Sequence, residues 1–197
     1  MRKIHPKYED LIDNQLIELS EILSPYFKKL NMSANNITTL SFIFGLLSIY
    51  FLYYDFYEYS VITYFISYFF DVMDGYYARK YKITSDFGDL YDHIKDFIVG
   101  VILFYILMYK VYYKNPNYIK CYLLILFIFF MLMNYYLGCQ ENIYNKKNDY
   151  IGVLEYHKFL CKKNPKKQIK IFKYTGTGTF IIMMFLLIYN IKFINCK

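Results

Sequence analysis

Four aspartates lie in or at the edge of long apolar segments, where charged side chains are rare. An aspartate near the centre of a bilayer costs about 2.5–3.5 kcal/mol on insertion scales, so it needs a partner or water. Two of the four belong to the segment 71–79 and two to the segment 88–96. We therefore take them as the residues that could do chemistry. They are Asp71, Asp74, Asp92 and Asp96.

Helical spacing gathers these aspartates onto two faces. Residues of the first segment follow the spacing i, i+3, i+4, i+7, which places them on one side of a helix. Those of the second segment repeat at every fourth position, which also defines one side. A short polar turn joins the segments, so the helices are antiparallel neighbours whose faces can oppose each other. The residues on the two faces are Asp71, Asp74, Gly75 and Ala78, then Gly88, Asp92 and Asp96.

Four converging carboxylates cannot all stay ionised without cations. Hard oxygen ligands on rigid helices favour Mg²⁺ or Mn²⁺ over Ca²⁺, which prefers flexible loops rich in carbonyl groups. Mg²⁺ normally accompanies a phosphate-bearing substrate. Gly75 and Ala78 keep their face small enough for a bulky ligand, and Arg79 is a fork-shaped donor for phosphate. Juxtamembrane charges on a solvated loop are the alternative, which four carboxylates at these spacings disfavour.

The pattern D-x2-D-G-x2-A-R-x8-G-x3-D-x3-D resembles the signature of the CDP-alcohol phosphotransferases, integral membrane enzymes of phospholipid synthesis. The resemblance covers roughly residues 8–100. Upstream, Asn36-Ile37-Thr38 is similar to the Pro-Asn-x-x-Thr motif at the start of the family's first span, although the proline is missing. All eight fixed positions of the signature match: Asp71, Asp74, Gly75, Ala78, Arg79, Gly88, Asp92 and Asp96.

The resemblance implies a role for each motif residue. Asp71, Asp74 and Asp92 would ligate a pair of divalent ions, Mg²⁺ or Mn²⁺. Asp96 would be the general base and also touch a metal, so that an acceptor hydroxyl attacks phosphorus and CMP leaves. The CDP moiety would be held by Asp74, Gly75, Ala78, Arg79, Gly88 and Thr84, with Ser85 as an alternative to Thr84.

The substrate class is indicated by conflicting features. His93, directly after Asp92, is similar to the choline and ethanolamine phosphotransferase branch. The run 84–88 is similar to the phosphatidylinositol and phosphatidylglycerophosphate synthase branch, and the short chain favours these users of CDP-diacylglycerol. We therefore expect transfer of a phosphatidyl group from CDP-diacylglycerol to an acceptor alcohol. Choline- or ethanolamine-type transfer to diacylglycerol is the alternative within the family.

Two further functions use the same residues. A divalent-cation carrier lined by the carboxylates would explain acidic residues in a membrane, but Arg79 would repel a permeating cation. A catalytically inactive lipid-binding relative is disfavoured because no motif position is substituted. The expected partners are a CDP-linked lipid or alcohol, an acceptor alcohol and membrane lipids. We expect no nucleic-acid partner.

The elements that position these residues follow from composition. The chain has 197 residues, is 57% hydrophobic and carries a net charge of +7, which is too apolar for a typical soluble domain or a disordered chain. Five apolar stretches approach the roughly 20 residues needed to cross a bilayer. This predicts an all-α, polytopic transmembrane bundle with five clear spans. A sixth span, near an amphipathic stretch at 151–161, is left open because the family core generally has six. The five stretches lie near 37–54, 60–78, 93–113, 118–138 and 174–191.

The chain divides into an N-terminal amphipathic, juxtamembrane segment (1–36) and a transmembrane phosphotransferase domain (37–197). Residues 8–30 have apolar positions at helical spacing, which predicts an interfacial helix interrupted at Ser24-Pro25. The polar N-terminus predicts no cleaved signal peptide. The face carrying Thr38, Ser41, Gly45 and Ser48 is a small-residue stripe, for packing within the chain or for a homodimer.

Lysine and arginine predict the orientation. The N-terminal segment and the loops after the second and fourth spans hold 17 of them, against 5 in the alternating segments, with Lys95 left inside a helix. By the positive-inside rule, the N-terminus and the active site face the cytoplasm. The basic segment 146–173 is interpreted as a topology and lipid-headgroup element, with binding of an anionic acceptor as the alternative. The four cysteines show no metal-site spacing and are interpreted as scattered free thiols.

Overall fold

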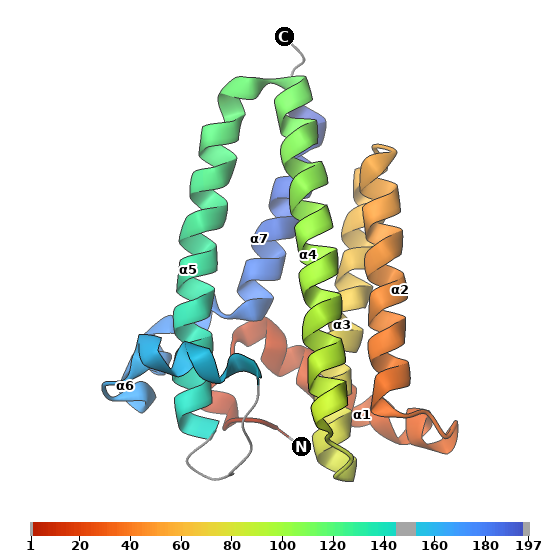
Figure 1. Cartoon of the computed structure of the whole chain (residues 1–197), viewed down its shortest axis with the longest axis vertical. Coiled ribbons are helices and arrows are strands. Elements are labelled where there is room, and N and C mark those ends of the chain that lie inside the picture. Colours follow the sequence, from red (N-terminus) through yellow and green to blue (C-terminus); the bar gives the residue numbers. More distant parts are fainter. Residues whose placement is uncertain (1, 145–152, 195–197) are drawn as a thin grey trace.

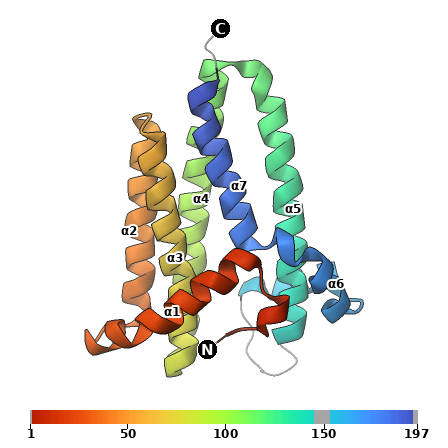
Figure 2. The same cartoon turned by 180° about the vertical axis from the view of Figure 1, so that it is seen from behind.

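The computed structural model describes residues 2–144 and 153–194, and every regular element within them is helical. Five helices run along the long axis of the molecule, and the N-terminal helix α1 lies across their lower ends (Figure 1, Figure 2). The long helices are α2 (Ala34–Tyr53), α3 (Tyr57–Tyr81), α4 (Asp86–Lys114), α5 (Ile119–Tyr144) and α7 (Thr177–Asn190). The remaining elements are η1 (Pro6–Tyr8), α1 (Leu11–Lys29), η2 (Pro116–Tyr118), η3 (Val153–Cys161), α6 (Pro165–Phe172), η4 (Lys173–Thr175) and η5 (Ile191–Phe193).

Each of the five predicted apolar stretches corresponds to a helix, which confirms the all-α membrane fold. Among the described residues, three segments are long and apolar enough to cross a bilayer: Ala34–Tyr53, Pro116–Tyr144 and Pro165–Phe193. Helices α3 and α4 have 25 and 29 residues and pack beside α2, but they carry the charged motif residues. That the chain crosses the membrane five times stays a prediction.

The small-residue stripe of α2 packs against α3 and α4 inside the chain. Ser67 of α3 donates a hydrogen bond to the carbonyl of Ser41 at 2.8 Å, and Ser48 donates to the carbonyl of Ser60 at 2.9 Å. A Cβ atom at Gly45 would lie 2.9 Å from a methyl carbon of Val99, so only glycine allows this approach of α4. Contacts within the chain therefore occupy this stripe.

The predicted interruption of the N-terminal helix at Ser24-Pro25 is wrong. Helix α1 continues through Pro25. Proline has no N–H group, so the carbonyl of Glu21 loses its helical hydrogen-bond partner. The Nζ atom of Lys80, from α3, donates to that carbonyl at 3.2 Å. A side chain from a distant helix thus satisfies the group that proline leaves open.

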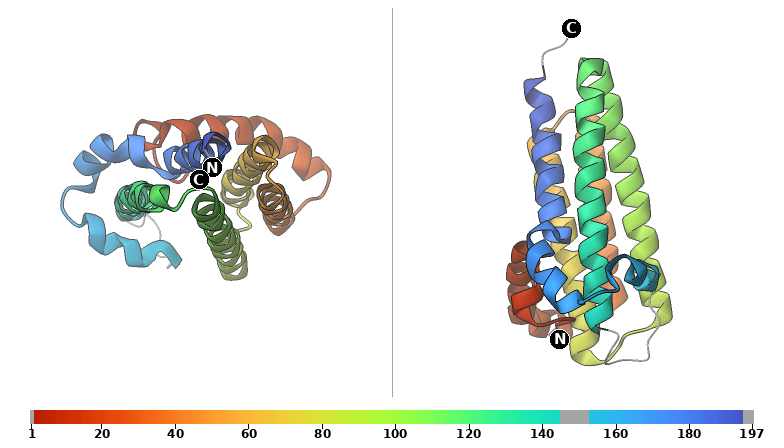
Figure 3. Two further views of the ribbon diagram at one scale, coloured as in Figure 1. Left: turned by 90° about the horizontal axis from the view of Figure 1, so that it is seen from above. Right: turned by 90° about the vertical axis from the view of Figure 1, so that its left-hand side faces the viewer.

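One carboxylate fixes α1 to the rest of the bundle. Asp10, which is 0% exposed, is the N-cap of α1, and its Oδ1 accepts hydrogen bonds from the N–H groups of Ile12 at 2.9 Å and Asp13 at 3.4 Å. Its Oδ2 accepts from the Gly176 N–H at 3.2 Å and the Thr179 hydroxyl at 2.7 Å. Asp10 therefore joins the start of α1 to the start of α7, which lie side by side in Figure 3.

Two further acids beside Asp10 should make the stability of this junction depend on pH. Burial raises the pKa of Asp13 to about 8 and that of Glu9 to about 7. Both values lie above those of an unfolded chain, so the folded protein holds protons that the unfolded chain releases between about pH 4 and pH 8. Their contribution to stability therefore falls as the pH rises through this range.

Asp13→Asn is expected to raise the melting temperature at pH 8 and to leave it almost unchanged at pH 4. The amide stays neutral, and its oxygen can still accept the hydrogen bond that Tyr68 donates to Asp13. Thermal unfolding in detergent, followed by circular dichroism between pH 4 and pH 8, measures the difference from wild type. Glu18→Gln, at a side chain that is 60% exposed, is the control. A constant difference across this range would contradict the prediction.

The cysteine prediction is wrong for two residues. Cys139 of α5 and Cys161 of η3 form a disulfide with a Cα–Cα distance of 5.0 Å. Cys121 is free and exposed, and Cys196 lies outside the described residues. The element η3 lies so close to α5 that a Cβ atom at Gly138 would be 2.3 Å from the carbonyl oxygen of His157. This packing brings together two thiols 22 residues apart, which their spacing alone does not indicate.

The described part of the stretch 151–161 does not form a sixth membrane span. Residues 153–161 form the 3-10 helix η3, which packs on α5. Of the basic segment 146–173, residues 146–152 lie outside the described part of the chain. From 158 onward the segment lies at the same end of the bundle as α1 and the turn between α3 and α4 (Figure 1). The three lysine- and arginine-rich segments therefore share one end to the extent that they are described.

Candidate active site

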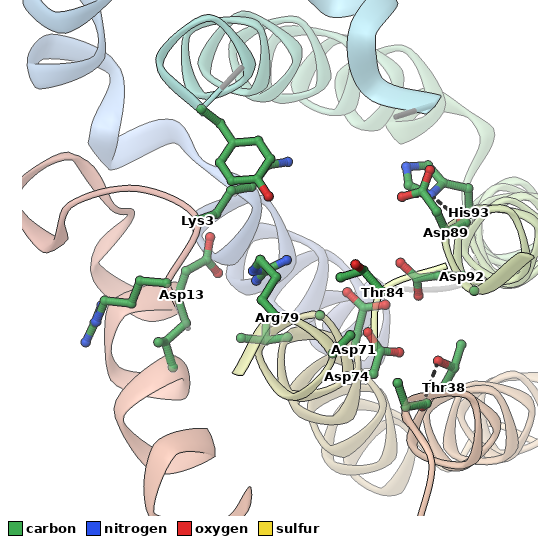
Figure 4. A pocket seen from close by; sticks show the side chains of 18 of the residues that line it. Lys3, Asp13, Thr38, Asp71, Asp74, Arg79, Thr84, Asp89, Asp92 and His93 are labelled. Carbon is green, nitrogen blue, oxygen red and sulfur yellow. Dashed lines mark hydrogen bonds and ion pairs between the residues drawn. The ribbon is translucent and has the colours of Figure 1, made fainter. Parts of the chain in front are cut away.

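A cavity of about 830 Å³ opens at this end of the bundle. Helix α3, the following turn and the first turns of α4 form one side, while α1, the N-terminal residues and the end of α5 form the other (Figure 4). All but one of the predicted site residues line it. They are Asp71, Asp74, Gly75, Ala78, Arg79, Thr84, Gly88 and Asp92, together with Ser85 and His93.

Three of the four aspartates form a tight cluster. Asp71, Asp92 and Asp96 each place a carboxylate oxygen within 4.8 Å of the others. Asp96 does not line the cavity, and its side chain is 55% exposed. Asp74 lies close to Asp71 in the cavity wall but outside this cluster (Figure 4). The predicted set is thus brought together in two parts, a cluster of three and a separate Asp74.

Asp74 is the most enclosed of the four carboxylates. The residue is 6% exposed, and its Oδ2 atom has no hydrogen-bond partner within the described structure. A buried carboxylate oxygen without a partner carries a substantial desolvation penalty. Its position in the cavity wall means that a bound cation or donor group can relieve this penalty. Thr38 of α2 lies beside it (Figure 4).

Lys95 is a site residue that the sequence interpretation missed. Its side chain is 2% exposed, and its Nζ atom pairs with Oδ1 of Asp71, with Asp92 at 3.0 Å and with Asp96 at 2.8 Å. The hydroxyl of Ser41 lies 3.1 Å away as a fourth partner. A charged residue inside a predicted span is a signal of function, and Lys95 carries that signal in this sequence.

Glycine at position 75 leaves room for the guanidinium group of Arg79. A Cβ atom at Gly75 would lie 3.1 Å from Nη1 and 3.4 Å from Nη2 of Arg79. At Gly88 a Cβ atom would lie 3.0 Å from Oδ1 of Asn35, so α4 begins close to α2. Ser85 caps α4 by accepting the Gly88 N–H at 3.1 Å. Gly75 therefore allows the Arg79 guanidinium to lie against α3, and Gly88 allows α4 to begin close to α2.

Comparison with known proteins decides the family. The family model described as CDP-alcohol phosphatidyltransferase matches residues 31–195, which is most of the chain. The chain belongs to this family. The match runs from before α2 to beyond α7, so it reaches much further than the motif resemblance over residues 8–100, and it leaves α1 out. No curated protein and no solved structure matches the chain.

As a member of this family, the protein is a membrane transferase of phospholipid biosynthesis. The family implies a CDP-alcohol as substrate and an alcohol as acceptor. The family is generally dependent on divalent cations. The residues present fit such an ion, because the cluster offers only carboxylate oxygens and Asp74 adds a buried oxygen without a partner. Hard oxygen donors of this kind suit Mg²⁺ or Mn²⁺.

The far half of the cavity comes from segments that the motif does not include. Arg2, Lys3, Glu9 and Asp13 line it from the N-terminal side, and Lys3 pairs with Glu141 of α5. The partners of that pair are 138 residues apart, so no local pattern could predict it. His93 lies at the rim, where its Nδ1 is 2.7 Å from the carbonyl oxygen of Asp89. The family motif therefore builds only one wall of this cavity.

Gly75→Ala is expected to lower kcat/KM for the CDP-alcohol about tenfold, mainly through KM. The added methyl group must displace the guanidinium of Arg79 by a fraction of an ångström, and misplacement of a binding group by about 1 Å can cost 10²-fold. Steady-state kinetics measure the effect. Gly100→Ala on α4 is a matched control, because its Cβ would meet nothing within 4 Å. Equal kinetics for wild type and both variants would contradict the proposed position of Arg79.

Proposed function

We propose that this protein transfers a phosphatidyl group from CDP-diacylglycerol to an acceptor alcohol and releases CMP. The observation that supports this most is that three motif aspartates and Arg79 line one cavity. An acidic wall beside a guanidinium group suits a diphosphate bridged to divalent cations. The motif glycines and Ala78 have small side chains or none, which leaves space in the cavity for the cytidine diphosphate.

In this proposal the chain's own residues perform separate tasks. Asp71, Asp74 and Asp92, together with Asp96, would hold a pair of divalent cations, Mg²⁺ or Mn²⁺. When bound, these cations would supply positive charge that neutralises the diphosphate and the departing CMP. Arg79 binds phosphate oxygens, and the backbone around Gly75, Ala78, Thr84 and Gly88 surrounds the nucleotide. Much of the rate enhancement comes from this positioning, as in phosphoryl transfer generally.

The reaction is a substitution at the phosphorus of the phosphatidyl group. The acceptor oxygen forms a bond to that phosphorus, while the bond from it to the bridging oxygen of the diphosphate breaks. CMP leaves with the bridging oxygen, and Asp96 takes the proton of the acceptor hydroxyl. The exposed face of Asp96 is open to a hydroxyl that arrives outside the cavity wall.

The proposed orientation places the cavity and the N-terminus on the cytoplasmic side. Support comes from the described lysine- and arginine-rich segments, which lie at the cavity end of the bundle (Figure 1). The opposite end carries the turn between α2 and α3 and the connection between α4 and α5, which are poorer in these residues.

Choline- or ethanolamine-type transfer is the second candidate, favoured by His93 at the rim of the cavity beside Asp92. In that reaction the phosphoalcohol group of a CDP-alcohol passes to diacylglycerol. A divalent-cation carrier is disfavoured by two cationic groups at the site. Arg79 lines the cavity, and the Lys95 ammonium lies among the carboxylates that a permeating ion would use.

A CMP-release assay on the purified full-length protein, with Mg²⁺ or Mn²⁺, tests these functions. One arm pairs CDP-diacylglycerol with a panel of alcohols, and the other pairs CDP-choline or CDP-ethanolamine with diacylglycerol. We expect turnover in the first arm only. Turnover in the second arm alone would replace the proposed substrate. Folded protein that is inactive in both arms, but carries Mn²⁺ across proteoliposomes without nucleotide, would overturn the transferase in favour of a carrier.

A further inference from the structure

The ammonium group of Lys95 lies where a cation shared by three carboxylates would bind. Its Nζ atom is within ion-pair distance of Asp71, Asp92 and Asp96, from helices α3 and α4. A hydroxyl from α2, that of Ser41, completes the surroundings at 3.1 Å. Three helices thus hold this ammonium, which the bundle buries almost completely.

An ion held by the same three carboxylates would need the same space. The oxygens that they offer lie within 4.8 Å of one another, and a divalent cation binds oxygen at about 2.0–2.6 Å. Such an ion and the nitrogen of Lys95 would therefore exclude each other. Removing the ammonium from its partners would leave a buried charge without compensation, which is strongly unfavourable.

Asp74 offers a separate position. Within residues 2–144 and 153–194, the ion pairs of Lys95 involve the three clustered aspartates and not Asp74. Asp74 is more than nine-tenths buried, lines the cavity and has an Oδ2 atom without a hydrogen-bond partner. One cation position, at Asp74, therefore stays open beside the ammonium.

We propose that the Lys95 ammonium takes the place of one divalent cation, so that each chain binds a single Mg²⁺ or Mn²⁺ ion instead of a pair. The inference rests on the proposed function, because it concerns the same site. It assigns Lys95 a direct role as a fixed positive charge held by Asp71, Asp92 and Asp96, next to the ion. Asp74 becomes the main ligand of the exchangeable ion.

The test counts Mn²⁺ ions per chain on the purified full-length protein in detergent, by equilibrium dialysis and electron paramagnetic resonance. We expect one ion in wild type, two in Lys95→Met and one in Lys95→Arg. Asp74→Asn should lose the single ion, which would locate it at this site. Lys110→Met is the matched control, because Lys110 is on the same helix but pairs with Asp55 at 2.9 Å, at the opposite end of the bundle. This control should bind one ion.

Two ions or none in wild type would overturn the proposal, whether or not Lys95→Met folds. One ion in folded Lys95→Met would also overturn it, because the vacated position would then not accept a cation. The CMP-release assay on the same preparations separates the two proposals. Turnover with two bound ions would overturn the role of Lys95 alone. One bound ion without turnover in either arm would overturn the transferase alone.

Discussion

Asp96→Asn is expected to lower the rate of CMP release by about 10²–10⁴-fold, the contribution that a positioned general base makes. It should retain divalent-ion binding better than Asp92→Asn does. The reason is geometric, since Asp92 lines the cavity whereas Asp96 lies on its outer side with a side chain that is 55% exposed. An amide keeps the shape of Asp96 but cannot take the proton of the acceptor hydroxyl.

Single-turnover CMP release and Mn²⁺ binding, measured on the same preparations, check this prediction. Asp86→Asn is the control, because Asp86 is an exposed carboxylate in the first turn of α4, outside the motif and outside the cavity wall. Its rate should remain near that of wild type. Wild-type turnover in Asp96→Asn would remove this residue as the base. Equal loss of ion binding in both motif variants would make Asp96 primarily a ligand.

Asp10→Ala is expected to be the most destabilising substitution in the N-terminal segment. It removes a buried carboxylate that accepts four hydrogen bonds, and it leaves the N–H groups of Ile12 and Gly176 without their partner. With about 1–3 kcal/mol for each buried group left unsatisfied, the loss is about 3 kcal/mol. In a chain of this length it corresponds to a decrease of about 6–12 °C in Tm.

Circular dichroism melting in detergent measures this loss. Glu18→Ala is the control, since Glu18 is an exposed residue of α1 that pairs with Arg2 at 3.4 Å. It should change the melting temperature by little, as exposed ion pairs contribute at most about 1 kcal/mol. If both variants melted together near the wild-type temperature, Asp10 would not hold α1 to α7 as described.

Local spacing predicted one wall of the site well. The i, i+3, i+4, i+7 pattern of α3 and the repeat at every fourth residue of α4 place motif aspartates where the two helices face each other. Helical geometry alone is enough to predict this arrangement. The opposite wall depends on tertiary contacts. The pair of Lys3 and Glu141 joins the N-terminal residues to the end of α5, and no periodicity in the sequence predicts it.

The wrong predictions have the same physical origin. A break at Pro25 was expected from the missing N–H group, but Lys80 from another helix compensates the carbonyl of Glu21. Free thiols were expected from cysteine spacing, but the packing of η3 on α5 joins Cys139 to Cys161. The role of Lys95 was missed because, besides Asp92 and Asp96 on its own helix, it pairs with Asp71 and Ser41 of other helices. In each case a side chain acts on a segment distant in sequence.

The junction at Asp10 also sets an order for the maturation of the chain. Two of its four hydrogen-bond donors belong to Gly176 and Thr179, which the ribosome adds more than 160 residues after Asp10. Until then the carboxylate lacks half of its partners, and α1 cannot take its final place against α7. The contact of α1 with α7 therefore forms last, whereas α3, on which α1 also packs, is made much earlier. A nascent chain that already contains every motif residue still lacks this junction.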